Sequence, residues 1–568
     1  MPGPYDCRVP VQFVQSRSHV TRAALLAALL TLLWTAPVAG ASWSAPARPP
    51  GCSASSPDVA PLVVFPSSEP SVRSGPGALL WSAPHGCGAR GSTGAGGEVV
   101  AAELAGDAAP GDAHPLAAEA GLTALTAATG TAAGQVVAFG SSDMGGAVVE
   151  GKVGGARSAS RPLGGPAAPV SAFSAYLGDV AVALPVRTRR GWAIAVRVQR
   201  HYDTSLGAPR LVPVGRHPVQ ALAVTLDFRA EALLVWASGG AIYACELPQS
   251  GRSQRVHRLA EVQAGLRILE LGALLSDDGH AIVTWRGQSS SGAPTTTLAL
   301  SISGAALALA PPRLLERFRD PGGLVPPPGS LRLIRLSSEA VMLAWTGVRD
   351  GRYAVLASPV SLRRGVWAPV AISESAGTAE RDTPAIGGGS PGSASPEGAS
   401  AAAGSSTQQE AVLSDIAPGP DAEAVAVWRV APHLPDGTFG RPGPDAWAID
   451  AARGHYAGRG EVSFDAPEQV APAGADGPPS VAIDPSTGDA LAAWVSLASG
   501  GLGHVEYAVR AAESPASPAF TNGARGARGG GGGGWIAPVV AAALALALAT
   551  GLLLGATHRP RGMRARRG

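Results

Sequence analysis

The sequence predicts an all-β protein: a β-propeller of about seven (six to eight) four-stranded blades, plus a signal peptide and one C-terminal transmembrane helix. Three observations support this. A short apolar run that ends in an aromatic residue recurs along the chain. Gly (75) and Pro (50) are too frequent among the 568 residues for long helices. Apolar segments of helical length occur only near the two ends.

The N-terminus predicts a secretory signal peptide over residues 1–41. Arg22 precedes a 12-residue apolar run over 23–34, and the small residues 39–41 follow. A basic start, a short apolar run and small residues before the cleavage point are the order of such a peptide. The run is short for a bilayer span, although an uncleaved anchor helix is the alternative. We expect cleavage after Ala41.

The C-terminus predicts a membrane anchor. Residues 535–557 form a run of 23 residues without a charge, long enough as a helix to cross a bilayer. Residues 511–534 before it are a Gly/Pro/Ser-rich stalk, and five arginines lie in the tail over 558–568. The positive-inside rule then predicts a single-pass plasma-membrane protein with a cytoplasmic C-terminus and the body outside. A buried core helix is the alternative.

The four cysteines fit an exported protein. Cys52 and Cys87 flank a Gly/Ser/Pro-rich stretch, and a disulfide between them is plausible in an oxidising compartment. Two unpaired small apolar residues are the alternative. Cys245 follows an apolar run and is expected to be buried in a strand. Cys7 lies in the predicted signal peptide.

The body over residues 130–510 contains the repeat. Each copy has a turn rich in Asp, Gly or Ser, an apolar run ending in a bulky anchor, and a second strand with an aromatic residue. Once the insertion over 373–409, which is expected to be disordered, is set aside, the copies recur about every 50 residues. The segment over 42–129 is expected to hold the first blade. The structural anchors are Trp236, Trp285, Trp345, Trp428 and Trp494, with weaker copies ending at Phe139 and Leu184.

One such meander is too small to bury both of its faces, so neighbouring units must stack with the anchors between them. A β-sandwich array is the alternative architecture. The last copy lacks an outer strand. Since propellers commonly close by borrowing a strand from the other terminus, we expect residues 61–65 to lie beside residues 480–510.

The clearest copies read Gly-x-Ala-x-x-x-Trp, over 279–285 and 488–494. An aromatic-Ala-Val strand and a Pro-containing strand accompany them. This pattern resembles bacterial, exported, actinobacterial-type β-propeller-like repeat proteins with a C-terminal membrane anchor. The resemblance covers about residues 130–510 and implies a propeller ectodomain at the cell surface. The early copies depart from it at Phe139 and Leu184, where the Trp is missing.

No chemistry-bearing motif stands out, so we predict no catalytic residues, no cofactor and no metal site. The 11 histidines form no metal-ligand pair. A Gly-x-Ser-x-Gly match over 388–392 lies in the insertion, without the strand and helix that a nucleophile elbow needs. Residues 276–280 resemble part of the Ser-x-Asp-x-Gly-x-x-Trp box of sialidases, but their spacing differs from it. Arg197, Arg286 and Arg510 are expected to be solvated charges at strand ends.

The prediction is a non-catalytic binding or scaffold protein with an extracellular protein or glycan ligand. The alternative is a surface glycosidase (sialidase-like) or lyase on the same fold, and a third is an envelope structural protein. Nucleic acid is not an expected partner, because the net charge of +2 comes from arginine-rich ends and leaves a mildly acidic body.

Overall fold

The structure is a computed structural model. It describes residues 42–512 with internal gaps, of which the longest are 66–76, 84–97, 320–329, 375–408 and 433–446. The predicted signal peptide, transmembrane helix and tail therefore lie outside the described residues, as does nearly all of the insertion. The chain divides into two compact units, residues 1–513 and 514–568, and the described residues belong to the first.

The described strands form eight sheets of four or five strands, in which strands consecutive in sequence pair antiparallel. The first four sheets are β2 (Leu62–Val64), β3 (Gly77–Ala83), β4 (Glu98–Leu104) and β5 (Pro110–Ala118); β6 (Leu122–Gly130), β7 (Gln135–Ser142), β8 (Gly145–Lys152) and β9 (Ser160–Gly164); β10 (Val170–Ser174), β11 (Val180–Thr188), β12 (Gly191–Gln199) and β13 (Arg210–Gly215); and β14 (Val219–Leu226), β15 (Ala232–Ser238), β16 (Ala241–Leu247) and β17 (Val256–Glu261).

The other four continue the series. They are β18 (Leu266–Leu275), β19 (Ala281–Ser289), β20 (Thr295–Ile302) and β21 (Arg313–Arg319); β22 (Leu331–Arg335), β23 (Ala340–Arg349), β24 (Arg352–Ser361), β25 (Gly365–Val366) and β26 (Val370–Ala371); β27 (Gln409–Pro418), the 3-10 turn η3 (Pro420–Ala422), β28 (Glu423–Pro432), β29 (Ala448–Gly458), β30 (Glu461–Phe464) and β31 (Glu468–Ala471); and β32 (Ser480–Ile483), β33 (Ala490–Leu497), β34 (Gly503–Arg510) and β1 (Ala54–Ser55).

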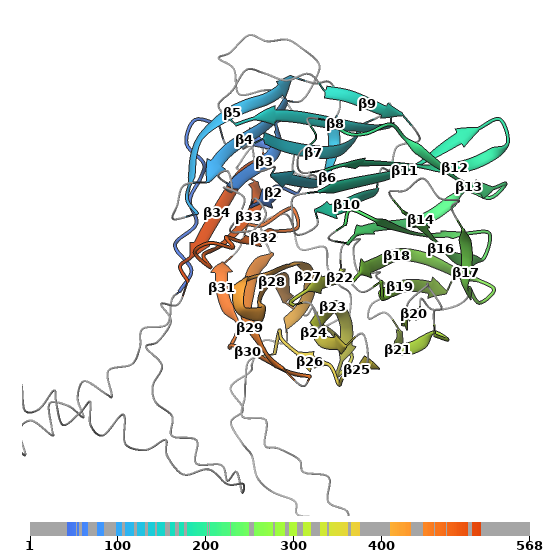
Figure 1. Cartoon of the computed structure of the whole chain (residues 1–568). Helices are drawn as coiled ribbons and strands as arrows, with labels where there is room; N and C mark the ends of the chain where they lie inside the picture. Colours follow the sequence, from blue (N-terminus) through green and yellow to red (C-terminus); the bar gives the residue numbers. More distant parts are fainter. Residues whose placement is uncertain are drawn as a thin grey trace, which may run out of the picture. The chain divides into compact units, whose positions relative to one another are not determined.

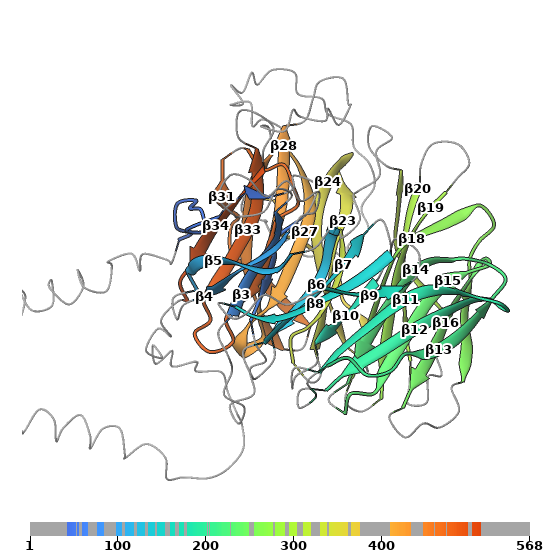
Figure 2. The same ribbon diagram turned by 90° about the horizontal axis from the view of Figure 1, so that it is seen from above.

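The first strands of the sheets form a closed circle of contacts. Each of β2, β6, β10, β14, β18, β22, β27 and β32 contacts the next, and β32 contacts β2 (Figure 1). Consecutive sheets therefore pack face against face around a common centre, as the turned view also shows (Figure 2). This is the arrangement of a β-propeller, with the first strand of each sheet innermost.

Burial explains why the apolar runs are continuous and not alternating. The second strand of a sheet has a neighbouring sheet on both faces, and all seven residues of β15 are buried. Outer strands show a different pattern, since β13 alternates between exposed residues and residues that are half-buried or buried. A strand covered on both faces needs apolar side chains at every position, whereas an outer strand needs them on one face only.

The last sheet is closed by the N-terminal segment. β1 pairs with β34, and isolated bridges join Trp43 to Arg510 and Ala47 to Tyr507. Residues 61–65 do lie beside β32, as expected, but the expectation that they supply the closing strand is wrong, because β2 pairs with β3 as the first strand of its own sheet. The closing segment, residues 43–55, carries three prolines and little apolar character, so its sequence gives no strand signal.

The predicted tryptophan anchors lie between neighbouring sheets. All five have side chains that are at most 6% exposed. Each packs in one cluster with residues of the preceding sheet, as Trp236 does with Ala183 and Ile194. Trp81 packs in the same way against the β32–β34 sheet. Phe139 is also buried, but it packs against the following sheet. Its side chain therefore points to the opposite face of its sheet from the tryptophan anchors.

Candidate functional site

The innermost strands carry a group of charged residues in three consecutive sheets. Pairing slips by one residue between Ile268 and Glu270 in β18, and between Leu413 and Asp415 in β27. A bulge of this kind re-aims the side chain that follows it. Both bulges are followed by an acidic residue, and the strand between them in the circle, β22, carries Arg332.

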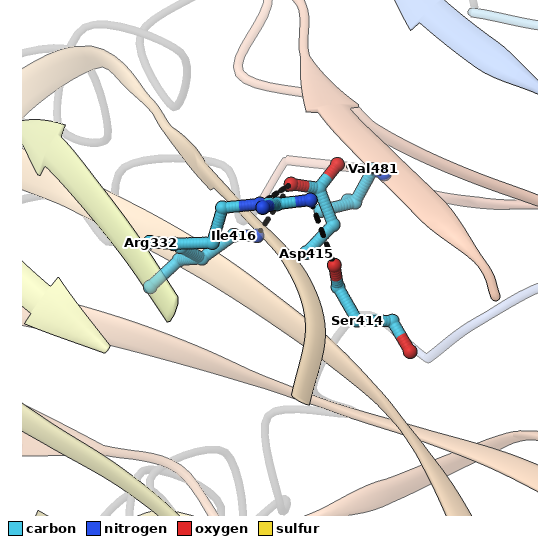
Figure 3. Close-up of polar contacts among 5 residues, drawn as sticks. All are labelled: Arg332, Ser414, Asp415, Ile416 and Val481. Carbon is cyan, nitrogen blue, oxygen red and sulfur yellow. Dashed lines mark hydrogen bonds and ion pairs between the residues drawn. The ribbon is translucent and has the colours of Figure 1, made fainter. Parts of the chain in front are cut away.

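Asp415 connects three sheets (Figure 3). Its Oδ1 accepts hydrogen bonds from Arg332 Nε at 3.3 Å and from its neighbour's backbone amide, Ile416 N, at 3.0 Å. Its Oδ2 accepts from Val481 N in the next sheet at 3.1 Å. Arg332 Nη2 also donates to the carbonyl of Ser414, the extra residue of the bulge, at 3.3 Å. The Asp415 carboxylate is thus occupied on both oxygens.

A second polar group lies between the β18 and β22 sheets. Arg286, on β19, forms an ion pair with Glu270 at 2.9 Å, and its side chain is 2% exposed. The same guanidinium donates to the hydroxyl of Ser330, just before β22. An isolated buried charge is costly, so the Glu270 carboxylate offsets part of the cost of burying the Arg286 guanidinium.

Asp450 is the acidic group with the most perturbed titration. Burial raises its pKa from 3.8 to about 6. It lies opposite Trp428 in the strand register. Ala448 and Ala452, two residues before and after Asp450 on the same face of β29, pack against the preceding sheet. Burial also lowers the pKa of Arg429, which lies over the Trp447 ring at 4.9 Å. Both groups face sheet interfaces.

Several sequence expectations can be placed on this structure. Cys52 is disulfide-bonded, while both candidate partners, Cys7 and Cys87, lie outside the described residues, so the Cys52–Cys87 pairing stays a prediction. Cys245 is a free, buried thiol whose pKa burial raises to about 11. In the described part of the chain, no group of His, Cys, Asp and Glu is arranged to hold a metal ion.

For two arginines, the solvent exposure predicted from the sequence is wrong. Arg286 and Arg510 were expected to be solvated, yet both are almost fully buried. Arg510 pairs with Glu468 at 3.1 Å and with Asp465 at 3.7 Å. Arg510 meets its acidic partners only through the stacking of sheets, whereas Glu270 lies opposite Arg286 on the neighbouring strand of the same sheet. Arg332, Glu270 and Asp415 were missed; the one sequence signal is an acidic residue within an innermost apolar strand.

The sequence matches no protein-family model, and no curated protein matches it. Solved structures match this chain only at low similarity. A protein of unknown function from Dyadobacter fermentans has 10% identity and a TM-score of 0.36, covering 84% of this chain and all of its own. The β-propeller domain of the Trilobed protease of Pyrococcus furiosus has 7% identity and a TM-score of 0.33, covering 70% of this chain and 97% of its own.

The intramolecular trans-sialidase of Ruminococcus gnavus has 9% identity and a TM-score of 0.32, covering 79% of this chain and 94% of its own. Scores this low carry no argument about activity, so the site must be interpreted from its own contacts. The actinobacterial-type resemblance therefore stays a prediction. No helix among the described residues has the length and hydrophobicity to span a bilayer, and residues 535–557 are not among them.

Proposed function

We propose that this chain is a non-catalytic binding or scaffold protein of the cell surface, with an eight-bladed propeller ectodomain and a C-terminal membrane anchor. The eight sheets and the closed circle of first strands support the blade number. The terminal sequence patterns support export and anchoring, with the C-terminus in the cytoplasm. Under this proposal, ligands are bound by loops and strand ends, as is common for propellers.

The proposal depends on the contacts that two carboxylates of the innermost strands make, those of Glu270 and Asp415. A glycosidase needs two carboxyl groups facing its substrate, separated by roughly 5–10 Å. Here Glu270 is paired with a buried guanidinium, and Asp415 accepts from an arginine and two backbone amides. The contacts of Asp415 join neighbouring sheets, while Glu270 pairs with Arg286 on the next strand of its own sheet. The acidic groups therefore act as ties within the scaffold, which leaves them poorly placed for proton transfer to a sugar.

The test separates binding from turnover. The purified full-length chain, in detergent, is incubated with a panel of neutral and acidic polysaccharides. Co-sedimentation measures binding, and size-exclusion chromatography of the polysaccharide measures cleavage. We expect binding to a member of the panel without any shortening of it.

Two variants test the alternative function, that of a glycosidase or lyase. Shortening of a polysaccharide that disappears in Glu270→Gln or Asp415→Asn, and persists in the exposed control Asp203→Asn, would establish a glycosidase or lyase and overturn the proposal. Thermal melts of the three variants identify any that have lost their fold.

A further inference from the structure

One end of four consecutive sheets carries many exposed arginines. They lie in the turns between second and third strands, and in the connections from one sheet to the next, of the sheets that begin with β10, β14, β18 and β22. We call this surface the basic end. Its arginines are Arg187, Arg189, Arg190, Arg216, Arg267, Arg319, Arg349 and Arg352, of which only Arg352 is partly buried.

The topology places these positions at one end. In an antiparallel meander, the turn after the second strand and the exit of the fourth strand lie at the same end. Contacts between sheets agree with this. Trp192 pairs with Gly215, beside Arg216, and Ser238 Oγ donates to His217 O in the preceding connection at 3.1 Å. Further round the circle, Val348 N donates to Glu316 Oε1 of β21 at 3.2 Å.

The charge at the basic end is of one sign. Among the described residues there, the exposed acids are Glu261, Asp350 and Glu374, fewer than the arginines, and Glu261 is already paired with Arg258. None of the eight arginines is in an ion pair with another described residue. The opposite end of the same sheets is mixed in sign, with Asp203 and Glu231 near Arg229 and Arg255. A single-sign surface attracts a ligand of the opposite charge.

Local structure at the basic end is unfavourable without such a ligand. Arg349 lies directly opposite Arg352 in the strand register, and like charges at that position repel. Arg189 and Arg190 occupy the two-residue turn closed by Thr188 and Gly191, in which Gly191 alone has a positive φ, so this turn accepts two adjacent arginines. A bound anion would relieve the repulsion between Arg349 and Arg352 and would be contacted by the paired arginines of this turn.

We propose that the basic end binds an acidic polysaccharide that carries carboxylate or sulfate groups. This inference rests on the proposed function and names its ligand class. Guanidinium groups bind carboxylate and sulfate oxygens in bidentate fashion. Since the arginines are spread over four sheets, they match charges repeated along a polymer better than one small anion. The Trp192 ring, with Arg187 at 5.8 Å from its centre, offers a flat apolar surface beside these charges.

The experiment uses the full-length chain in detergent. Binding to heparin, which is sulfated, and to polygalacturonate, which is carboxylated, is measured at low and high salt, with dextran as the neutral control. The test variants are Arg189→Glu with Arg190→Glu, and Arg349→Glu with Arg352→Glu. The matched control is Arg255→Glu with Arg313→Glu, which makes the same charge change on exposed residues at the opposite end.

We expect the chain to bind both acidic polymers, more weakly at high salt, and not to bind dextran. Each test variant should lose about tenfold in affinity, and the control variant less than about threefold. Thermal melts verify that all variants fold.

Equal binding by wild type and test variants overturns the inference, as does equal binding to dextran. Tighter binding to single-stranded DNA, or to phosphatidylglycerol vesicles, than to either polysaccharide overturns it in favour of a nucleic-acid or lipid partner. The two proposals fail differently. A ligand bound elsewhere, without cleavage, leaves the binding function intact, whereas cleavage of a polysaccharide overturns that function.

Discussion

At the scale of single residues, the indole side chains fix how neighbouring sheets meet. Their ring nitrogens are not equivalent. Trp345 Nε1 donates to Glu316 Oε2 in the preceding sheet at 2.5 Å, whereas Trp236 Nε1 is buried without a hydrogen-bond partner. Trp236 is instead stacked on Tyr243, with ring centres 5.5 Å apart. The same residue type therefore contributes a polar link at one interface and only apolar packing at another.

This difference predicts unequal effects of one substitution. Trp345→Phe removes a hydrogen bond to a carboxylate, while Trp236→Phe removes only ring volume. We expect Trp345→Phe to lower the free energy of unfolding by about 1–3 kcal/mol more than Trp236→Phe does. Urea denaturation followed by circular dichroism measures both. A larger loss in Trp236→Phe would show that packing, and not the hydrogen bond, dominates at these sites.

A second residue-scale prediction concerns Asp450. Because the folded state holds its proton up to about pH 6, and the unfolded state only to about pH 3.8, this residue lowers stability as the pH rises between those values. Asp450→Asn has no such titration. The variant should gain stability relative to wild type from pH 4 to 6, by at most about 3 kcal/mol, with no further change above pH 7.

Unfolding of both proteins is measured at several pH values, with the exposed Asp203→Asn as control. A difference between Asp450→Asn and wild type that does not vary with pH would place Asp450 in a polar environment.

At the scale of elements, closure of the circle depends on a segment without apolar pattern. Ala47 N donates to Tyr507 O at 2.9 Å, and Tyr507 N donates to Ala47 O at 2.8 Å. Arg48 forms an exposed ion pair with Glu506 at 3.2 Å. Backbone pairing, more than side-chain burial, holds this segment in place. It covers an edge strand that would otherwise offer unpaired groups to another chain.

Proline substitution tests this pairing. Ala47→Pro removes the donor to Tyr507 and should lower the midpoint of thermal unfolding and promote aggregation. Ala45→Pro is the control, because no described residue accepts a hydrogen bond from Ala45 N. Light scattering during a thermal ramp measures both effects. Similar behaviour of the two variants would mean that the closing segment contributes little.

The sequence predicted the strands and anchors well and the polar contacts poorly. Apolar runs ending in tryptophan identify second strands because those strands are buried on both faces, which requires a sequence pattern. Asp415 and Arg332 come from different sheets, 83 residues apart, and meet only through a bulge. Neither a bulge nor a partner in another sheet leaves a local pattern. The closing segment was missed for the same reason, since its partner lies over 450 residues away.

At the scale of the whole molecule, the proposed anchor predicts where a shortened chain goes. A chain that ends at Glu513 lacks the apolar run over 535–557 but keeps the first compact unit. It should be exported and released, while the full chain stays in the membrane fraction. Cell fractionation followed by immunoblotting measures this. Retention of the shortened chain in membranes would point to an uncleaved N-terminal anchor.

The closing pairs also set an order of events for biogenesis. Ser44 is synthesised early, yet its partner Val509 is among the last residues of the propeller to be synthesised. Until β34 has been synthesised, the N-terminal segment has no strand with which to pair. Folding of the propeller therefore ends with a late ring-closing step, which cannot occur until almost the whole propeller has been synthesised.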